Sequence, residues 1–514
     1  MSVRLAVVLC LLYCADGLRH FSRQVPLSIA SLSHASNQEF VNSIRSSAQS
    51  STNPDAASIL DELDFRINSF DFVTLCECLV TITNAETVQD RRHQNLITET
   101  LSALERSTLK EMPNYGVTPQ SILNLLTALV RSEYRWGQLK IEYREALTSH
   151  IRDILSTDTT SVSVLSEICW CLGKLKFDHD KDLLGLISKI PESHTLTDAS
   201  ISRLVHGYFL LGIRWNQLSK LSRRNVVIAG VASMGAMNDQ SLSSYLYAMA
   251  KMGASWSVFD ALQLEETFSH IKRVIPLAND VLLSNILWSL GRLGCKADTI
   301  PHHVLKAVYF RVHQLSPLGP STFASTVFSL NTIGVKYRDL PNTAIVDFEQ
   351  SFGIYVSPSE LSVSTLIYGL GCMGFQLSKS SASVQHRLFS ALHSILPQVT
   401  AQGLSNILYG LAKMADEDFS VGDKNETWAL LLDATRYMML KDVTSLQATS
   451  NVVWSLGQLC SRHPSLADIA ARNNSILDSF YYAIDRYADK MNEQALSNTL
   501  SGLAKVIHSS GMIT

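Results

Sequence analysis

A short motif that recurs about every forty residues constrains this chain more than any other feature of its sequence. The motif starts with a small residue, usually Ser. A polar residue, two apolar residues, an aromatic residue, a small residue, Leu or Met, Gly or Ala, and often a cation follow. A period of this length is typical of stacked supersecondary units, none of which can bury its apolar face alone. Clear copies begin at Ser166, Ser243, Ser284, Ser364, Ser405, Ser450 and Ser497, weaker copies at Ser202 and Ala324, and degenerate copies at Val73 and Leu123.

Each repeat is predicted to contain two helices. Pro320 and Pro358 stand where a first helical turn accepts proline. A second apolar-periodic segment follows the motif, as in residues 302–315 and 384–396. The sequence therefore predicts an all-α fold, an α-α superhelical solenoid of about eleven two-helix repeats of roughly 40 residues. The predicted N-terminal cap or turn residues are Thr197, Asn238, Asn279, Thr400 and Thr444, and the predicted C-terminal glycines are Gly212, Gly253, Gly294, Gly334 and Gly374.

The composition agrees with a folded chain and excludes two classes of protein. Only 17% of the 514 residues are charged and 46% are apolar, so extended disorder is excluded for all but a short stretch. A net charge of -3 excludes a strongly basic protein whose overall charge would hold a polyanion. No apolar run approaches the roughly 18 residues of a membrane-spanning helix, so we expect no membrane span in the mature chain.

The N-terminus has the composition of a targeting sequence. Residues 1–17 combine Arg4 with an apolar run and small residues, which is the layout of a signal peptide. Residues 18–55 are rich in Ser and contain Arg19 and Arg23, like a transit peptide followed by a linker. Together they resemble the bipartite presequences of algae with secondary plastids, which implies a plastid location. Simple secretion and mitochondrial import are the alternatives. Residues 56–514 are assigned to the repeat domain.

The cysteines and the missing catalytic motifs favour a binding protein in an organelle. Seven cysteines follow the apolar run of the signal peptide, an odd number with no C-x-x-C pair, so neither a disulfide framework nor a zinc site is expected. A disulfide-free interior suits an organelle matrix. The sequence has no nucleophile elbow, P-loop, zincin motif or dinucleotide fingerprint. We therefore expect no catalytic residues, no cofactor and no metal.

A projection of the motif at about 100° per residue sorts its positions, counted from the small anchor residue, into three faces. Positions +2, +3, +6 and +9 are apolar and form the predicted core. The anchor, +4 and +7 are predicted to pack against the adjoining repeat. Positions +1, +5 and +8 form a third face that is predicted to be exposed. Its +5 residues are small: Ala128, Ala248, Ser289, Ser329, Gly369, Gly410, Ser455 and Gly502.

The third face places amides beside cations, once in each repeat. Amide side chains can pair with base edges and cations can contact phosphates, so the stacked rows suggest a surface that binds RNA. A solvated polar face is the alternative interpretation of any one residue. The predicted RNA-binding residues are Asn124, Asn285, Asn406, Asn451 and Asn498 at +1, and Arg131, Lys174, Lys251, Arg292, Lys413, Gln458 and Lys505 at +8.

The motif copies SNILWSLGRLG, SNILYGLAKMA and SNVVWSLGQLC resemble the first helix of octotricopeptide repeats and of the related repeats that precede RAP domains in FAST-kinase-like organelle proteins. The resemblance covers about residues 60–507. It implies sequence-specific binding of organelle RNA that regulates transcript stability, processing or translation. It also implies partners in an RNA-processing or ribosomal complex. The Pro-Pro-Pro-Glu-Trp-Gln-like segment of many octotricopeptide repeats is missing, and no RAP domain is recognisable.

A second resemblance supports a different function. Armadillo repeats have a similar period and grip an extended peptide with a Trp and an Asn four residues later. Here the residue four after the aromatic is a cation or Gln, as at Arg292 and Gln458. This departure weakens peptide binding, but an armadillo-like protein-protein interaction scaffold stays the alternative function.

Overall fold

The computed structural model describes Leu75 and residues 118–156, 161–177, 181–188, 198–353, 359–419, 425–441, 445–472 and 475–509. Every regular element in these segments is a helix, which confirms the predicted all-α fold. The targeting segment and the degenerate copy at Val73, apart from Leu75, lie outside the described residues. The chain divides into two compact units at residues 236 and 237, and each unit is an array of two-helix repeats.

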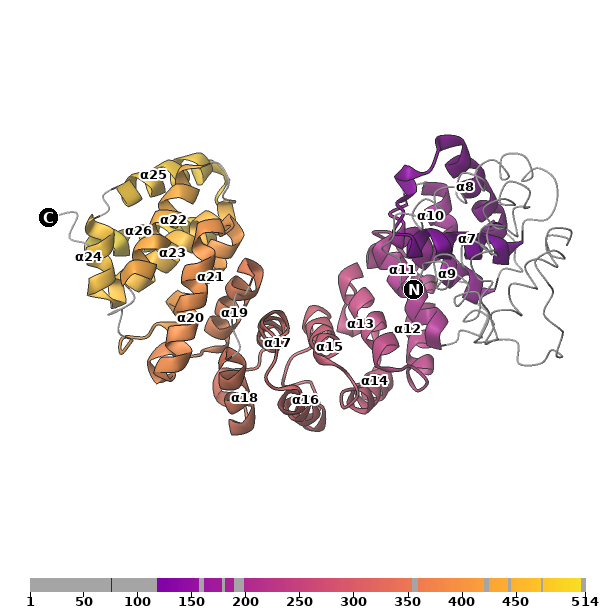
Figure 1. Ribbon diagram of the computed structural model, residues 1–514, viewed down its shortest axis with the longest axis horizontal. Helices are drawn as coiled ribbons and strands as arrows, with labels where there is room; N and C mark the ends of the chain where they lie inside the picture. Colours follow the sequence, from indigo (N-terminus) through magenta and orange to yellow (C-terminus); the bar gives the residue numbers. More distant parts are fainter. Residues whose placement is uncertain are drawn as a thin grey trace, which may run out of the picture. The chain divides into compact units, whose positions relative to one another are not determined.

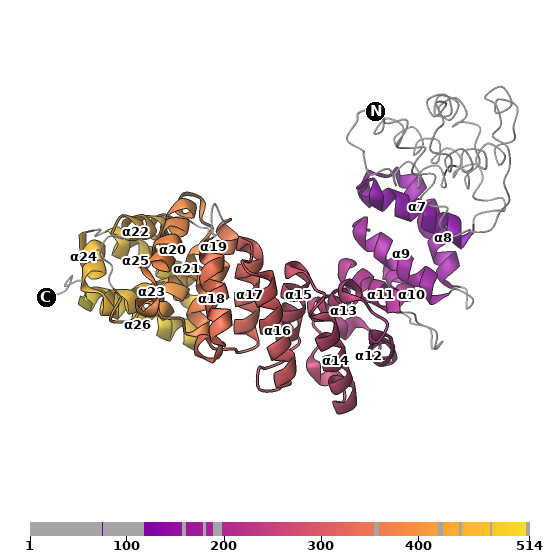
Figure 2. The ribbon, with the colours of Figure 1, turned by 60° about the horizontal axis from the view of Figure 1, so that its bottom comes forward.

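Unit 1 contains three repeats within the described residues. The helices that carry the motif, here called first helices, pack against one another in chain order, α7 against α9 and α9 against α11 (Figure 2). The first helices are α7 (Pro119–Arg131), α9 (Val162–Lys174) and α11 (Asp198–Leu210), and the second helices are α8 (Ile141–Ser156), α10 (Lys181–Ile187) and α12 (Lys220–Met234).

The described residues of unit 2 contain seven further first helices, and the two kinds of helix form two layers. Each first helix contacts the next first helix, and each second helix contacts the next second helix (Figure 1). The first helices are α13 (Asp239–Met252), α15 (Asp280–Arg292), α17 (Pro320–Thr332), α19 (Glu360–Met373), α21 (Ala401–Met414), α23 (Leu446–Arg462) and α26 (Glu493–Ser509). The second helices are α14 (Ala261–Val274), α16 (His302–Leu315), α18 (Asn342–Gly353), α20 (Ala382–Ile395), α22 (Asn425–Leu440) and α25 (Ser475–Tyr487).

One helix departs from the two-helix pattern. The short helix α24 (Pro464–Arg472) stands between α23 and α25 and contacts α22, α23 and α26. It lengthens the last repeat, which explains why the spacing of the motif is wider between Ser450 and Ser497 than in the middle of the chain.

The predicted helix ends agree with the structure wherever it describes them. The side chain of Asn279 accepts a hydrogen bond from the backbone N–H of Leu282 at 2.9 Å, and Asn238 and Thr400 cap α13 and α21 in the same way. Pro320 lies in the first turn of α17. Thr197, Thr444 and Pro358 lie outside the described residues, and the cap residues of α19 and α23 are Ser359 and Ser445. The predicted C-terminal glycines all have positive φ, from 72° to 93°.

A backbone hydrogen bond joins neighbouring repeats at the end of their first helices. The N–H of Trp256, just after α13, donates to the carbonyl oxygen of Leu293 at the end of α15, at 2.7 Å. Trp136 and Leu175 make the same bond between α7 and α9, also at 2.7 Å. A helix leaves its last carbonyl groups unpaired, so these bonds satisfy an acceptor and fix the spacing of the repeats.

The predicted core is confirmed. Positions +2, +3, +6 and +9 of α15 are Ile286, Leu287, Leu290 and Leu293, and each is at most 1% exposed. The anchor and +7 are buried as well, as in Ser284 and Gly291, which agrees with packing against the adjoining repeat.

The predicted exposure of position +5 is wrong. The five non-glycine residues there, Ala128, Ala248, Ser289, Ser329 and Ser455, are 0% exposed, and the three glycines are buried. The reason is that a first helix is covered on both flanks, because the +7 side of one helix packs against the +5 side of the next. A Cβ atom on Gly371, at +7 of α19, would lie 2.8 Å from Cα of Gly410, at +5 of α21. Small residues at both positions allow the helix axes to approach closely.

The cysteines of the described segments are free, in agreement with the sequence interpretation. Cys169, Cys171, Cys295 and Cys460 are buried and Cys372 is partly exposed. Burial raises the pKa of the Cys171 thiol to about 11 and that of Cys460 to about 12. Among the segments that the structure describes, no helix is both long and apolar enough to cross a membrane.

Candidate nucleic-acid interface

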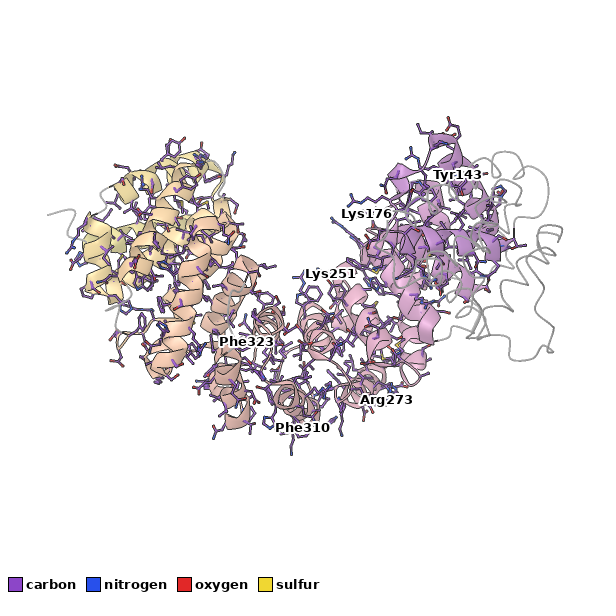
Figure 3. All side chains as sticks on the ribbon, viewed as in Figure 1. Tyr143, Lys176, Lys251, Arg273, Phe310 and Phe323 are labelled. Atoms are coloured by element: carbon purple, nitrogen blue, oxygen red, sulfur yellow. The ribbon has the colours of Figure 1, made fainter. Side chains whose placement is uncertain are left out.

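The surface of the first-helix layer is formed by four motif positions, −3, +1, +4 and +8, which we call the first-helix ridge. These positions lie within about 60° of one another on a helix with 100° per residue. The two flanks and the inner face of a first helix that stands between two others are mostly buried, so this arc is what the layer presents to solvent there. In Figure 3, Lys251 projects from this layer, whereas Phe310 projects from the second-helix layer and Phe323 lies between the two.

The predicted amide and cation positions lie on this ridge. All five asparagines at +1 are partly exposed. At +8, Arg131, Lys174, Lys251, Arg292 and Lys413 are exposed, while Gln458 and Lys505 are partly exposed. The structure therefore brings the predicted residues of successive first helices onto one surface within each unit.

Aromatic side chains at +4, which the sequence predicts at the contact between repeats, also share this surface. In unit 2 they are partly exposed from α13 to α23, and rings contact one another between α13 and α15 and from α17 through α23. Ring centroids are 5.1 Å apart for Tyr247 and Trp288, 6.2 Å for Phe328 and Tyr368, 5.7 Å for Tyr368 and Tyr409, and 5.4 Å for Tyr409 and Trp454. The rings therefore line much of the ridge of unit 2 with apolar surface. In unit 1 the corresponding residues are Trp170 and His206.

The cations at +8 lie over these rings. The Nζ atom of Lys251 is 5.3 Å from the ring centroid of Tyr247 in its own helix and 4.7 Å from that of Trp288 in the next. Lys413 bridges two helices in the same way, at 5.6 Å from Tyr409 and 5.2 Å from Trp454. A cation over an aromatic face is attracted by the ring quadrupole, which orders the long side chain while its ammonium group stays exposed.

Two departures interrupt the row of cations in the middle of unit 2, where Thr332 and Cys372 occupy +8. Lys336, which follows α17, is exposed and donates a hydrogen bond from Nζ to the carbonyl oxygen of Cys372 at 3.3 Å. It thus brings a cation to the end of α19, where the motif supplies none. Lys336 is not predicted from the motif, because it lies beyond the last motif position.

Glutamines at −3 are a second feature that the motif did not include. The Nε2 atom of Gln120 donates to Oδ1 of Asn124 at 3.0 Å, and Gln402 and Asn406 make the same bond, also at 3.0 Å. These pairs hold the +1 amide in a fixed orientation. Their signal in the sequence is a Gln four residues before the Asn of the motif, since residues four apart face the same side of a helix.

An ion pair replaces the amides in part of unit 1. Glu167 and Arg203 occupy +1 of α9 and α11 and form a salt bridge between the two helices. The chemistry of the ridge therefore differs between unit 1 and the amide-rich first helices of unit 2.

Burial perturbs the ionisable groups on the ridge. It lowers the pKa of His206 below 6.5, and the nearby charge of Lys174 acts in the same direction. It raises the pKa of Tyr368 to about 12, so this phenol is neutral at physiological pH. The ridge of unit 2 therefore combines neutral rings with positive charges.

Metal ligands are not grouped in the part of the chain described here. No set of three or more His, Cys, Asp or Glu side chains among these residues is close enough to hold a metal ion. A pocket of about 360 Å³ lies between α20 and α22 and is lined by His386, Phe389 and His393 among others.

Comparisons with known proteins add no functional information. No family model and no curated protein matches the chain. The chain is similar to a solved structure described as a homology model of the full-length AP-3 complex in an intermediate open conformation, at 12% identity and a TM-score of 0.30, over 95% of this chain and 90% of that chain. A similarity of this size carries no argument about function.

Proposed function

We propose that this chain binds single-stranded RNA along the first-helix ridge and recognises its sequence, as the resemblance to octotricopeptide-type repeats implies. The observation that carries the proposal is the alternation of ring and cation from one repeat to the next, with Lys251 and Lys413 each bridging two aromatic rings. Single-stranded nucleic acids bind surfaces that combine aromatic rings, on which bases stack, with cations that follow the phosphates.

The arrangement of the ridge suggests how a nucleotide would lie. In α15 and α21 the amide at +1 comes first, the ring follows three residues later, and the cation follows four residues after the ring. At about 1.5 Å per residue, the +1 amide and the cation are roughly 10 Å apart along the axis. A base would contact the ring and the amides while its phosphate approaches the cation. The ring centroids, 5.1 to 6.2 Å apart, leave too little room for a base between two rings, so bases would lie against the exposed surface of the row.

Charge reversal at three positions tests the proposal. Replacing Lys251, Arg292 and Lys413 together by Glu is expected to abolish RNA binding, because the ridge would repel phosphates. Helical content is expected to stay nearly unchanged, since all three side chains are exposed. The melting temperature is expected to fall only slightly, because exposed cation–π contacts worth about 0.5 to 1 kcal/mol each are lost. A matched control replaces Lys220, Lys272 and Lys306, which are exposed on second helices, by Glu. This control makes the same change in net charge and is expected to keep RNA affinity.

Unaltered RNA affinity in the ridge variant would contradict the proposal. Ultraviolet crosslinking in the organelle separates it from the scaffold alternative: RNA binding predicts specific transcripts, whereas a scaffold predicts protein partners and background levels of RNA. The proposed process is control of transcript stability, processing or translation, with partners in an RNA-processing or ribosomal complex.

The proposed location is the plastid. It rests on the composition of residues 1–55, which lie outside the described residues. A fluorescent fusion to this segment is expected to accumulate in the plastid. Accumulation in mitochondria or in the medium would support one of the alternatives instead.

A further inference from the structure

The last three first helices of unit 2 carry the same pair of amides at the same motif positions. In each helix the Gln at −3 donates a hydrogen bond from Nε2 to Oδ1 of the Asn at +1, and the distance is 3.0 Å in all three. The pairs are Gln402 and Asn406 in α21, Gln447 and Asn451 in α23, and Gln494 and Asn498 in α26.

The hydrogen bond fixes which atoms each pair offers to a ligand. It occupies one N–H of the glutamine and one lone pair of the asparagine, so the glutamine Oε1 stays available as an acceptor and the asparagine Nδ2 as a donor. All three glutamines are exposed and all three asparagines partly exposed. An oriented acceptor beside an oriented donor is the arrangement with which amides pair to a base edge.

The pairs stand where a base edge would lie. In α21 the ring of Tyr409 follows Asn406 by three residues and Lys413 follows four residues later, on the same exposed arc. An i,i+4 amide pair stabilises a helix at any exposed position. Here the pairs occur at one motif position only. On the same arc, α23 carries the ring of Trp454 with Gln458 in place of the cation, and α26 carries Lys505 with Ser501 in place of the ring.

The preceding first helices of unit 2 differ from these three. The −3 and +1 residues are Gln240 and Ser244 in α13, which are hydrogen-bonded at 3.2 Å. In α15, α17 and α19 they are Val281 and Asn285, Ser321 and Ser325, and Leu361 and Thr365. The identical acceptor and donor set is therefore confined, within unit 2, to three consecutive helices.

We propose that α21, α23 and α26 recognise three consecutive nucleotides that carry the same base, each through its Gln–Asn pair. This inference rests on the proposed RNA-binding function. Because successive first helices are neighbours and offer the same hydrogen-bonding groups, they select the same base at adjoining positions of one RNA strand. The helices with other residues at −3 and +1 select different bases, or discriminate less strongly between bases.

Selection from a random single-stranded RNA pool, followed by sequencing, tests the inference with the full chain. The enriched RNAs are expected to share a run of three identical bases. Replacing both Gln447 and Asn451 by Ala is expected to reduce the preference about 10-fold at the central position of the run and to leave its neighbours unchanged, since one good pair of base contacts is worth roughly that factor. The control replaces Gln314 and Gln350, exposed amides of α16 and α18, by Ala and is expected to keep the full motif.

The outcomes separate the inference from the function on which it rests. Enrichment of RNAs that lack such a run, or a central-helix variant with an unchanged motif and an unchanged circular dichroism spectrum, overturns the inference while RNA binding stands. Failure of the wild-type chain to retain any RNA overturns both. Loss of preference at the central position alone supports both.

Discussion

The ammonium group of Lys251 lies 4.7 Å from the ring centroid of Trp288, a residue of the next repeat. The two residues belong to α13 and α15, so the contact joins neighbouring first helices at the surface of unit 2. Trp288 also contacts the ring of Tyr247 at 5.1 Å, which places the cation against two rings at once. The contact stabilises the repeat stack and also sets the position of a charge on the ridge.

A double-mutant cycle measures this contact. Lys251→Met and Trp288→Leu are expected to show a coupling energy of about 0.5 to 1 kcal/mol in the free energy of unfolding, the usual size of a cation–π contact at an exposed site. Urea unfolding of the wild type, both single variants and the double variant gives this value. Combining Trp288→Leu with Lys306→Met, on the second helix α16, is expected to give additive effects. If the effects of Lys251→Met and Trp288→Leu on the free energy of unfolding were additive as well, the contact would contribute nothing to stability.

A second prediction concerns the close approach of α19 and α21. Gly410 is buried at position +5, and a Cβ atom there would lie 2.5 Å from the carbonyl carbon of Ile367. The obstacle is backbone, so the two helices would have to separate. Gly410→Ala is expected to destabilise unit 2 by about 2 kcal/mol, as overpacking of a tight contact does. Thermal or denaturant unfolding measures the change.

The matched control uses a glycine with free space around it. Gly185 lies in α10, is exposed, and has nothing within 4 Å of a Cβ atom. Gly185→Ala is expected to be neutral or to stabilise by about 0.5 to 1 kcal/mol, because Ala has the higher helix propensity. If Gly410→Ala and Gly185→Ala changed the free energy of unfolding in the same direction, close packing would not be the reason for glycine at +5.

The sequence predicts the repeat, its core and most of its helix ends, because these depend on local periodicity and on cap residues. Asn279 caps the N-terminus of α15, and Gly294 follows the C-terminus of the same helix with φ 93°, both as expected. The sequence does not predict which flanks of a first helix are covered, because that depends on how far apart neighbouring helices stand. Ser289 was therefore expected on the surface and is 0% exposed. Trp288 contacts the neighbouring repeat as expected, but it is also partly exposed. The site residues Lys336 and Gln402 were missed because neither belongs to the motif.

A third prediction compares two residues at the same motif position. Gly294 follows α15 with φ 93°, and Lys176 follows α9 with φ 55°. A side chain in this left-handed region costs about 1 to 2 kcal/mol. Gly294→Ala is therefore expected to destabilise unit 2 by about 1 kcal/mol, and Lys176→Gly to stabilise unit 1. Chemical unfolding with a probe in each unit measures both. If Gly294→Ala left the free energy of unfolding unchanged, the turn would be able to change its φ without a loss of stability.

The depressed pKa of His206 predicts a pH-dependent stability. Burial, assisted by the charge of Lys174, lowers this pKa in the folded chain below its ordinary value of 6.5. As the pH falls below about 6.5, the unfolded chain binds a proton that the folded chain does not, so the stability of unit 1 decreases. His206→Phe removes this contribution, and we expect a smaller loss of unfolding free energy between pH 7.5 and pH 5.5. An unchanged pH dependence in the variant would show that His206 is protonated in the folded chain as readily as in the unfolded one.

The last prediction separates the contribution of the cations to RNA affinity from that of the rings. Each phosphate that a protein cation contacts contributes about −0.7 to the slope of log affinity against log salt concentration for a single strand. Replacing Lys251, Arg292 and Lys413 by Gln is therefore expected to reduce the steepness of this slope by about 2. Trp454→Leu removes a ring and no charge, so it is expected to weaken RNA binding at every salt concentration and to leave the slope unchanged. Affinities measured by fluorescence anisotropy at several salt concentrations give both slopes. If the slope of the Gln variant equalled that of the wild type, the three cations would not contact phosphates, which would contradict their proposed role.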